Sequence, residues 1–252
     1  MSGPHTPTAA AVIVGDEVLS GKVDDLNTPI LARALRRAGV ALRGVEVVPD
    51  EAGPLIAALQ RALDRGEHVF TSGGIGPTHD DITVGCVGEA MGRPLARHAE
   101  MEAVLRRLYG ERFKEAHLRM AELPEGARLW TDGSLRMPVV CVERVYILPG
   151  VPSLFREKSE WIARQLSTDP FYAYEVCCLC GEGTLAPILS QLQAAAPGVS
   201  IGSYPRFNDR FRVKVVIESK DAAAVEGVYV ALRGALADDA IFSHGRLGAD
   251  LD

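Results

Sequence analysis

The sequence has no long apolar run, no secretory leader and no surplus of basic charge, and each absence excludes a class of protein. A membrane-spanning helix needs roughly 18 to 20 consecutive apolar residues, and no run in this chain reaches that length. The opening residues, MSGPHTPT, lack the basic start and the apolar stretch of a signal peptide. We therefore expect a cytoplasmic protein without a membrane partner.

The formal charge and the cysteines narrow the class further. The 252 residues include 27 basic and 33 acidic side chains, a net charge of −6, without a basic tract that would bind nucleic acid. The five cysteines are an odd number without disulfide spacing, so we expect reduced thiols. The run CCLC at 177–180 would send its sulfurs to opposite faces of a strand, which disfavours a zinc site.

Strand-like and helix-like segments alternate along the first two thirds of the chain. AAAVIV at 9–14 predicts a strand buried on both faces, and NTPILARALRRAG predicts a helix with Asn27 as its N-cap. The continued alternation is typical of an α/β fold with a mostly parallel, doubly wound sheet. The expected division is a flexible N-terminus at 1–8, an α/β domain at 9–167 and a second domain at 168–252.

The second domain has a different order of elements. Its expected strands are 172–180, 199–204, 210–218 and a short one near Ile241, and its expected helices are 183–195 and 221–236. This split β-α-β pattern packs helices on one face of a small mixed or antiparallel sheet, so we predict a smaller α+β domain. It could cover a pocket or build an oligomer, and we expect a homo-oligomer because such assemblies are common.

The loop TSGGIGPTHDD at 71–81 has more turn residues and polar groups than a simple connection requires. In an open parallel sheet, ligands bind beyond the carboxyl ends of the strands, where the following loops all emerge. Two other strands end in VIVGDE and VYILPGVPS, so three loops would meet at that edge. The predicted ligand-binding residues are Gly15, Glu17, Asn27, Thr71, Gly73, Gly74, Gly76, Pro77, Thr78, Thr83, Pro149, Gly150 and Pro152.

The chemistry of these loops is of two kinds. Glycines allow positive φ and close backbone approach, so successive amides can form a nest for a phosphate beside a helix N-terminus. Carboxylates at the same edge would repel a phosphate unless a divalent cation such as Mg²⁺ lies between them. We therefore predict a phosphorylated small-molecule ligand. We also predict that the same acidic residues bind the metal ion and act in catalysis. The predicted metal ligands are Asp16, Glu17, Asp80 and Asp81, and the predicted catalytic residues are Asp16, Asp80 and Asp81.

Structural explanations compete with several of these roles. A glycine-rich turn after a strand can be only a tight turn, and either Asp80 or Asp81 could be a helix cap while the other is the functional acid. A lone loop histidine such as His79 is more often a surface residue than a general acid or base. Lys22 is either a phosphate contact or a solvated surface lysine.

Several motifs together resemble a known family. They are GDEVLSG, the pair LN at 26–27, TSGGIGPTHDDIT, ELPEGA at 122–127 and ILPGVP at 147–152. They are similar to the molybdopterin-binding-like domain of the competence/damage-inducible protein A family, and more closely to the N-terminal molybdopterin-binding-like domain of eukaryotic FAD synthases. VVPDE, GEGTLAPIL and IGSYPRFNDRFRVKV extend the likeness to FAD synthases over most of residues 9–240.

The resemblance implies a three-layer α/β/α fold and two candidate functions. Members of this fold bind molybdopterin or hydrolyse the pyrophosphate bond of ADP-ribose or FAD with a divalent metal. We therefore expect a metal-dependent pyrophosphohydrolase of a nucleotide-diphosphate compound. The alternative is a protein of molybdenum cofactor biosynthesis that binds molybdopterin or a nucleotide without turnover.

Two departures from the family pattern bear on these expectations. The family usually has Asp-Thr-Asn where this chain has Asp25-Leu26-Asn27, which removes a hydroxyl from the predicted pocket. The sequence ends at residue 252, before the amidase domain of the competence family or the nucleotidyl-transfer domain of FAD synthases would begin. We therefore expect neither of those two reactions.

Overall fold

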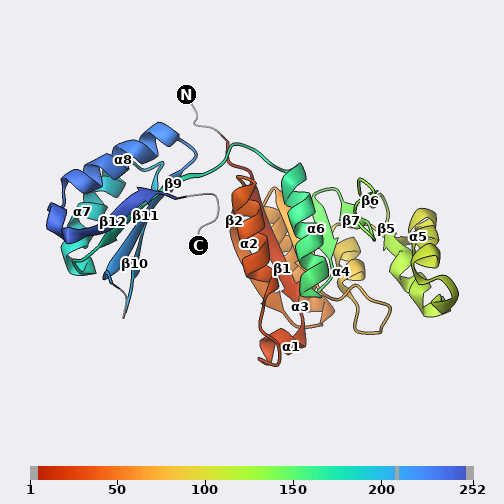
Figure 1. The fold of residues 1–252 in the computed structure, drawn as a ribbon. Helices are drawn as coiled ribbons and strands as arrows, with labels where there is room; N and C mark the ends of the chain where they lie inside the picture. The colour runs from red at the N-terminus through yellow and green to blue at the C-terminus, as the bar shows by residue number, and fades with distance from the viewer. Residues whose placement is uncertain (1–4, 208–209, 248–252) are drawn as a thin grey trace. The chain divides into compact units, whose positions relative to one another are not determined.

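The computed structural model describes residues 5–207 and 210–247, and the chain divides into two compact units (Figure 1). The boundary falls between Ser167 and Thr168, and residues 7–167 form the first unit. Among the described residues, no helix is long and apolar enough to cross a membrane. Each unit has its own sheet and its own hydrophobic core.

The first unit is built on a six-stranded sheet whose strand order is β2-β1-β3-β8-β7-β6. The first four strands in this order are parallel, whereas β7 and β6 are each antiparallel to their neighbour. The bounds are β1 (Thr8–Val14), β2 (Ala41–Val48), β3 (His68–Ser72), β6 (Arg128–Trp130), β7 (Val139–Val142) and β8 (Val145–Leu148). The order jumps from β3 to β8, so β1, β3 and β8 lie side by side although they are far apart in sequence. This confirms the predicted doubly wound, mostly parallel sheet.

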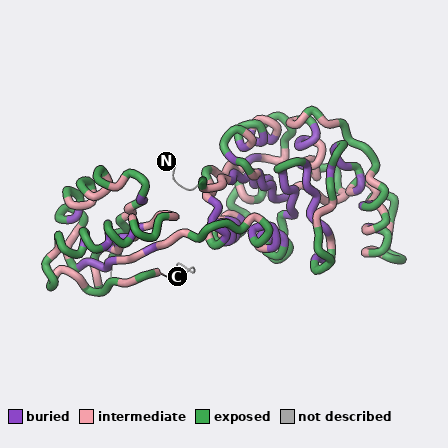
Figure 2. The backbone as a smooth tube through the Cα atoms, turned by 90° about the horizontal axis from the view of Figure 1, so that it is seen from above, coloured by how far each residue is buried: buried purple, intermediate pink, exposed green. Residues whose placement is uncertain are grey.

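Helices cover both faces of this sheet, which gives three layers (Figure 1). Helices α2 (Asn27–Arg37) and α6 (Pro152–Gln165) pack on one face, and α3 (Ala52–Arg65) and α4 (Thr83–Ala90) pack on the other. Apolar residues at helical spacing produce this burial, as where Leu31 and Leu35 of α2 are fully buried. Strands between two helix layers must be apolar throughout, and Figure 2 shows the central strands as buried.

The start of α2 differs from the prediction. Asn27 is not the N-cap, because it already lies in the helix and its side chain makes no capping bond. The carboxylate Oδ1 of Asp25 instead accepts hydrogen bonds from the amides of Asn27 at 2.9 Å and Thr28 at 3.0 Å. An aspartate two residues earlier therefore satisfies the exposed helix amides. This leaves the Asn27 side chain available for contacts in the interior.

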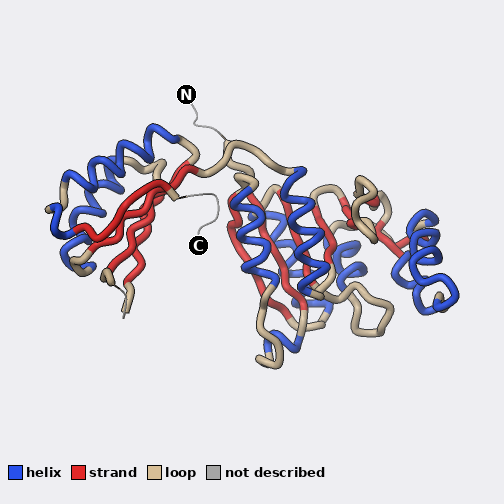
Figure 3. The backbone as a smooth tube through the Cα atoms, in the orientation of Figure 1, coloured by secondary structure: helices blue, strands red, loops and turns tan. Residues whose placement is uncertain are grey.

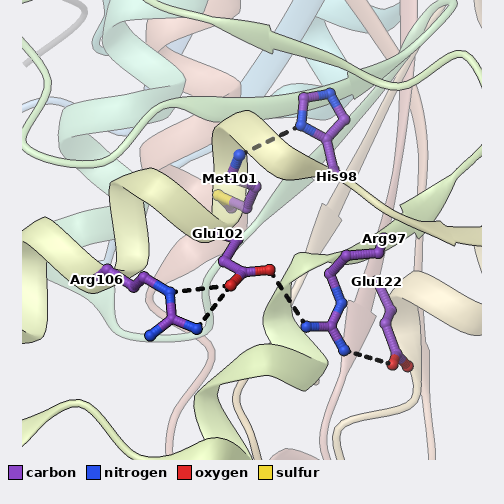
Figure 4. Close-up of polar contacts among 6 residues, drawn as sticks. All are labelled: Arg97, His98, Met101, Glu102, Arg106 and Glu122. Carbon is purple, nitrogen blue, oxygen red and sulfur yellow. Dashed lines mark hydrogen bonds and ion pairs between the residues drawn. The ribbon is translucent and has the colours of Figure 1, made fainter.

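A lobe of residues 95–124 projects from the first unit. The antiparallel pair β4 (Leu95–Arg97) and β5 (Glu122–Pro124) carries helix α5 (Ala99–Tyr109) and the 3-10 helices η1 (Gly110–Arg112) and η2 (Glu115–Ala121). Figure 4 shows the ion pairs within the lobe. Arg97 contacts both Glu102 and Glu122, and Arg106 pairs with Glu102 at 2.7 Å. The His98 Nδ1 atom accepts a hydrogen bond from the Met101 amide and caps α5. Charged groups on the surface of the lobe and the buried Met101 hold α5 on the hairpin.

The second unit has a four-stranded antiparallel sheet in the order β10-β11-β9-β12 (Figure 3). Its elements are β9 (Tyr172–Cys178), α7 (Glu182–Ala195), β10 (Ser200–Pro205), β11 (Val213–Ser219), α8 (Ala222–Gly234), the 3-10 helix η3 (Asp238–Ala240) and β12 (Ile241–Arg246). Both helices pack on one face of the sheet around a core that includes Val176, Val215 and Leu185. This confirms the predicted smaller α+β domain.

The CCLC run lies at the end of β9. Cys177 and Cys178 are buried, and Cys180 is half-buried. Burial raises the pKa of the Cys178 thiol to about 12, so this thiol stays protonated at neutral pH. These side chains therefore act as small core residues.

Candidate ligand-binding site

A cavity of about 1010 Å³ lies in the first unit, beyond the carboxyl ends of β1, β3 and β8. Val14, at the end of β1, and Pro149, directly after β8, contribute to its wall. The three loops predicted from sequence each supply lining residues. The predicted residues in the lining are Glu17, Gly73, Gly74, Gly76, Pro77, Asp80, Asp81, Pro149 and Gly150.

The glycines of the loop after β3 are required by its backbone. Gly73 has φ +101°, and a Cβ there would lie 2.4 Å from the carbonyl oxygen of Val14. Gly74 has φ +64°, and its Cβ would lie 2.4 Å from the Oγ1 atom of Thr83. Thr83 Oγ1 in turn donates to the Gly73 carbonyl at 2.8 Å. The loop is therefore folded tightly against β1 and the first turn of α4, in a conformation open only to glycine.

The Asp81 carboxylate closes the other end of this loop. Its Oδ2 atom accepts hydrogen bonds from the amide of Thr78 at 2.8 Å and from the Thr78 hydroxyl at 2.5 Å. The same hydroxyl is also the main cause that lowers the pKa of Asp80 below its usual value. Asp80 is thus an exposed, ionised carboxylate at the cavity, while one oxygen of Asp81 is engaged in holding the turn.

Acidic residues gather at the rim of the cavity on the β1 and β2 side. Glu17 lies in the short helix α1 (Asp16–Leu19), directly after β1, and Asp50 follows β2. The Asp50 Oδ2 atom accepts a hydrogen bond from the Asp16 amide at 2.9 Å. Burial is the largest cause that raises the pKa of Asp50, and the nearby charges of Glu17, Asp16 and Asp80 raise it further. Four acids from three loops therefore share one electrostatic environment.

Asp50 was not among the residues predicted from sequence. It lies in VVPDE, a motif that the resemblance included, and it follows a strand at the same sheet edge as the predicted loops. A search of every strand's carboxyl end for acidic residues would have found it.

The acidic rim does not form a preformed metal cage. In the described part of the chain, no group of three or more His, Cys, Asp or Glu side chains could hold a metal ion. Mg²⁺ is commonly bound by only one or two carboxylates, with phosphate oxygens and water completing its shell. The donor set of Glu17, Asp50 and Asp80 therefore fits a cation that arrives with a phosphorylated ligand, and it does not fit a cation held by protein alone.

Asn27 lies beneath the site. It is 6% exposed, and its Nδ2 atom donates to Ser72 Oγ at 2.8 Å and to the Gly150 carbonyl at 2.7 Å. One side chain thus joins α2, the end of β3 and the loop after β8. Asn27 supports the cavity wall, because the amide that could reach a ligand is already bonded to the two loops.

The remaining predicted residues lie outside the lining. Thr71 is fully buried in β3, Thr83 is buried under the glycine loop, and Pro152 is the first residue of α6. Also outside the lining are Gly15, Asp16, Thr78, His79 and Lys22. The His79 side chain is 98% exposed, as expected for a surface residue. These residues shape the loops or lie beside the cavity.

The cavity lining also contains basic and aromatic side chains that the sequence did not predict. Arg112, Arg136 and Lys158 are the basic lining residues. Tyr109 and His117 also line the cavity, and their rings stack with centroids 3.9 Å apart and an interplanar angle of 13°. They come from the lobe, from the segment before β7 and from α6, none of which ends a parallel strand at the sheet edge. Only the tertiary fold brings them to the cavity.

A parallel α/β sheet with a glycine loop and a ligand cavity at its carboxyl edge defines the general class of this protein. Residues 10–168 match the family described as "Probable molybdopterin binding domain", and residues 170–244 match "FAD synthase, middle domain". The chain belongs to the molybdopterin-binding domain family, and the resemblance predicted from its motifs is confirmed.

Individual relatives agree with this assignment. The chain is 29% identical over 282 residues to a "Probable FAD synthase" of Caenorhabditis elegans, which covers 98% of this chain and 53% of the relative. It therefore spans about half the length of that FAD synthase. A protein of Aeropyrum pernix is 33% identical over 213 residues, covering 79% of this chain and 80% of the relative.

Among solved structures, the CinA protein of Thermoplasma acidophilum, described as having unknown function, resembles this chain with a TM-score of 0.58 and 27% identity. The match covers 64% of this chain and 98% of the CinA chain. This share is similar to that of the first unit, so the likeness supports its fold.

Proposed function

We propose that the protein hydrolyses the pyrophosphate bond of a nucleotide-diphosphate compound such as ADP-ribose or FAD, with the help of a divalent cation. The observation that carries this proposal is the lining of one cavity by a glycine loop, an acidic rim and a basic, aromatic wall. Its volume of about 1010 Å³ is at the upper end of the range for small-molecule sites, so it suits a ligand with two parts.

The glycine loop is suited to the phosphate part of such a ligand. Gly74 and Gly76 line the cavity, and the lack of a Cβ at both positions would let a phosphoryl oxygen approach their backbone amides. The Asp81 carboxylate lies beside Gly76, where a Cβ would be 2.6 Å from its Oδ2 atom. The start of α4 follows the loop and adds a partial positive charge. This part of the site would orient the diphosphate for attack.

The acidic rim is suited to catalysis beside that diphosphate. Glu17, Asp50 and Asp80 would hold the cation that accompanies the ligand. Two of these residues, Glu17 and Asp80, belong to the set of metal ligands predicted from the sequence. When bound, such a cation neutralises phosphate charge and lowers the pKa of a bound water. The carboxylates of the rim would orient the attacking water by hydrogen bonds.

The aromatic end of the cavity is suited to the heterocycle of the ligand. Tyr109 and His117 form a flat stacked pair, and a hydrogen bond of 2.9 Å from the Lys114 amide to His117 Nδ1 fixes the imidazole. Aromatic and apolar walls bind planar rings by stacking and burial. The relative named as a FAD synthase supports FAD as the first ligand to test.

The experiment is an assay for AMP release. The protein would be incubated with FAD, ADP-ribose and NADH, each with Mg²⁺, Mn²⁺ or Co²⁺, and the products separated by chromatography. We expect AMP from at least one of these pairs, and no release when EDTA is present. The absence of AMP in every combination would contradict the proposal.

A second candidate function is the binding of molybdopterin or a nucleotide without turnover. It is favoured by the engagement of Asp81 with Thr78, which gives that carboxylate a structural role. It predicts tight binding of a phosphorylated pterin with no hydrolysis of any nucleotide. It also predicts that Asp80→Asn leaves the affinity intact, whereas the hydrolase proposal predicts loss of AMP release.

A further inference from the structure

Lys158 is a buried cation with no anionic partner among the described residues. The residue lies in α6 and lines the cavity, yet it is only 6% exposed. Its Nζ atom donates to the carbonyl oxygens of Met137 and of Pro138, the latter at 2.8 Å. Within residues 5–207 and 210–247, no carboxylate lies within ion-pair distance of this ammonium group. The described hydrogen-bond partners of this charge are therefore two neutral carbonyl groups.

Burial of this ammonium group carries an electrostatic cost. Burial lowers the pKa of Lys158 to about 8, although the neighbouring Glu157 acts in the opposite direction. A buried charge is usually paired, because removal from water without a partner costs free energy. An ammonium group has three N–H donors, and the two carbonyls take two of them. The third donor has no partner among the described residues, and Lys158 lines the cavity, which is the arrangement expected where an anion arrives with a ligand.

A second cation lines the same cavity. Arg136 precedes Met137, the first carbonyl partner of Lys158, and its side chain is exposed at the cavity. A guanidinium group binds a phosphate in a bidentate manner, whereas an ammonium group acts as a compact point charge. Together they bring two positive charges to the cavity lining, one from α6 and one from the segment before β7.

We infer that Lys158 and Arg136 form a second anion subsite, which binds the phosphoryl group that the glycine loop does not hold. The inference rests on the proposed function in that the ligand is phosphorylated, and it adds that the site selects diphosphates over monophosphates. The glycine loop holds one phosphoryl group through backbone amides, and the two cations hold the other. Lys158 binds this phosphoryl group through the third N–H of its ammonium group, which neither the Met137 nor the Pro138 carbonyl accepts.

The experiment compares two ligands that differ by one phosphoryl group. AMP and the α,β-methylene analogue of ADP share the same base and sugar, and the methylene bridge cannot be hydrolysed. Affinities would be measured by calorimetry, with and without Mg²⁺, on the full chain and on Lys158→Met and Arg136→Gln. Arg164→Gln is the matched control, because Arg164 is exposed on the same helix and does not line the cavity.

We expect the unaltered protein to bind the ADP analogue roughly ten times more tightly than AMP, as one charge-assisted phosphate contact would give. Lys158→Met and Arg136→Gln should each remove most of this preference while changing AMP affinity by less than about threefold, and Arg164→Gln should keep it. If both variants retain the preference, or if AMP and the analogue weaken equally, Lys158 only supports the 137–138 backbone and the inference is wrong.

The outcome separates this inference from the proposed function. If the preference for the ADP analogue depends on Lys158 and Arg136 but no substrate releases AMP, the second anion subsite is supported and the hydrolase function is contradicted. If AMP is released but the preference is the same in both variants, the hydrolase function is supported and the subsite is contradicted. Arg136 is exposed, so its variant tests the subsite even where Lys158→Met lowers stability.

Discussion

At the scale of single residues, the site depends on side chains whose polar atoms are only partly satisfied by the protein. Asp50 is a half-buried carboxylate with a raised pKa, among three other acids. Lys158 is a buried ammonium group with a lowered pKa. Both pKa shifts are unfavourable to the charged form, and both groups line one cavity. Such groups cluster at sites that receive a ligand of opposite or bridging charge.

The titration of Lys158 predicts how the stability of the protein changes with pH. Its pKa is about 8 in the folded chain and 10.5 as its ordinary value, so between these pH values the unfolded chain binds more protons. The free energy of unfolding should therefore rise with pH across this window, by on the order of 3 kcal/mol for this group. Urea denaturation of the unaltered protein and Lys158→Met would measure the difference at several pH values. A difference that stays constant across the window would contradict the prediction.

The glycine loop gives a second prediction at this scale. Gly74→Ala should destabilise the protein by about 2 kcal/mol or more, because alanine would need a positive φ and would collide with Thr83 Oγ1. Thr83→Ala removes the colliding atom but also its bond to the Gly73 carbonyl. The double variant should therefore be less destabilised than the sum of the single variants. Denaturant unfolding of all four proteins measures this, and strict additivity would show that the collision does not occur.

At the scale of secondary-structure elements, the cavity exists because loops from distant strands are tied together. Asn27 is the clearest tie, since its amide joins α2, the end of β3 and the loop before α6. The helix and strands of the lobe at residues 95–124 are connected differently, by surface ion pairs around Arg97 and Glu102 (Figure 4). Each such pair contributes little stability. We expect the buried tie to matter more for the fold than the surface pairs.

Substitution of Asn27 tests that comparison. Asn27→Ala should lower the free energy of unfolding by about 2 to 3 kcal/mol, because Ser72 Oγ and the Gly150 carbonyl both lose a buried donor. Ser72→Ala removes only one of the two bonds and should cost roughly half as much. Arg97→Gln should cost less than about 1 kcal/mol. A larger loss for Arg97→Gln than for Asn27→Ala in urea denaturation would contradict this ranking.

At the scale of the whole molecule, the first unit supplies the described lining of the cavity. Within residues 5–207 and 210–247, the lining residues lie between Val14 and Lys158, and the boundary between the units follows at Ser167. We therefore predict that a fragment of residues 7–167 folds and binds the same phosphorylated ligands as the full chain, within about threefold in affinity. Circular dichroism and calorimetry would check it. A folded fragment that has lost binding would show that residues 168–252 contribute to the site.

The sequence predicts the fold well because its signals are local. Strand and helix periodicities in segments such as 9–14 and 27–37 depend only on neighbouring residues, and parallel sheets bring their loops to one edge. The glycine loop could be predicted for the same reason, because its glycines and acidic residues are contiguous in the sequence. The Asn27 cap was wrong because Asp25, two residues earlier, reaches the same amides. The sequence alone does not identify Tyr109, Arg136 and Lys158 as lining residues, because only tertiary packing brings them to the cavity.

The central claim is that one cavity holds and cleaves a nucleotide diphosphate between a glycine loop and an acidic rim. The most direct measurement is AMP release from FAD and ADP-ribose by the unaltered protein, with Asp80→Asn as the companion variant and Mg²⁺, Mn²⁺ or Co²⁺ present. The account predicts metal-dependent AMP release that falls by about a hundredfold or more in Asp80→Asn. No release from either compound with any of these metals, or release that Asp80→Asn leaves unchanged, would contradict it.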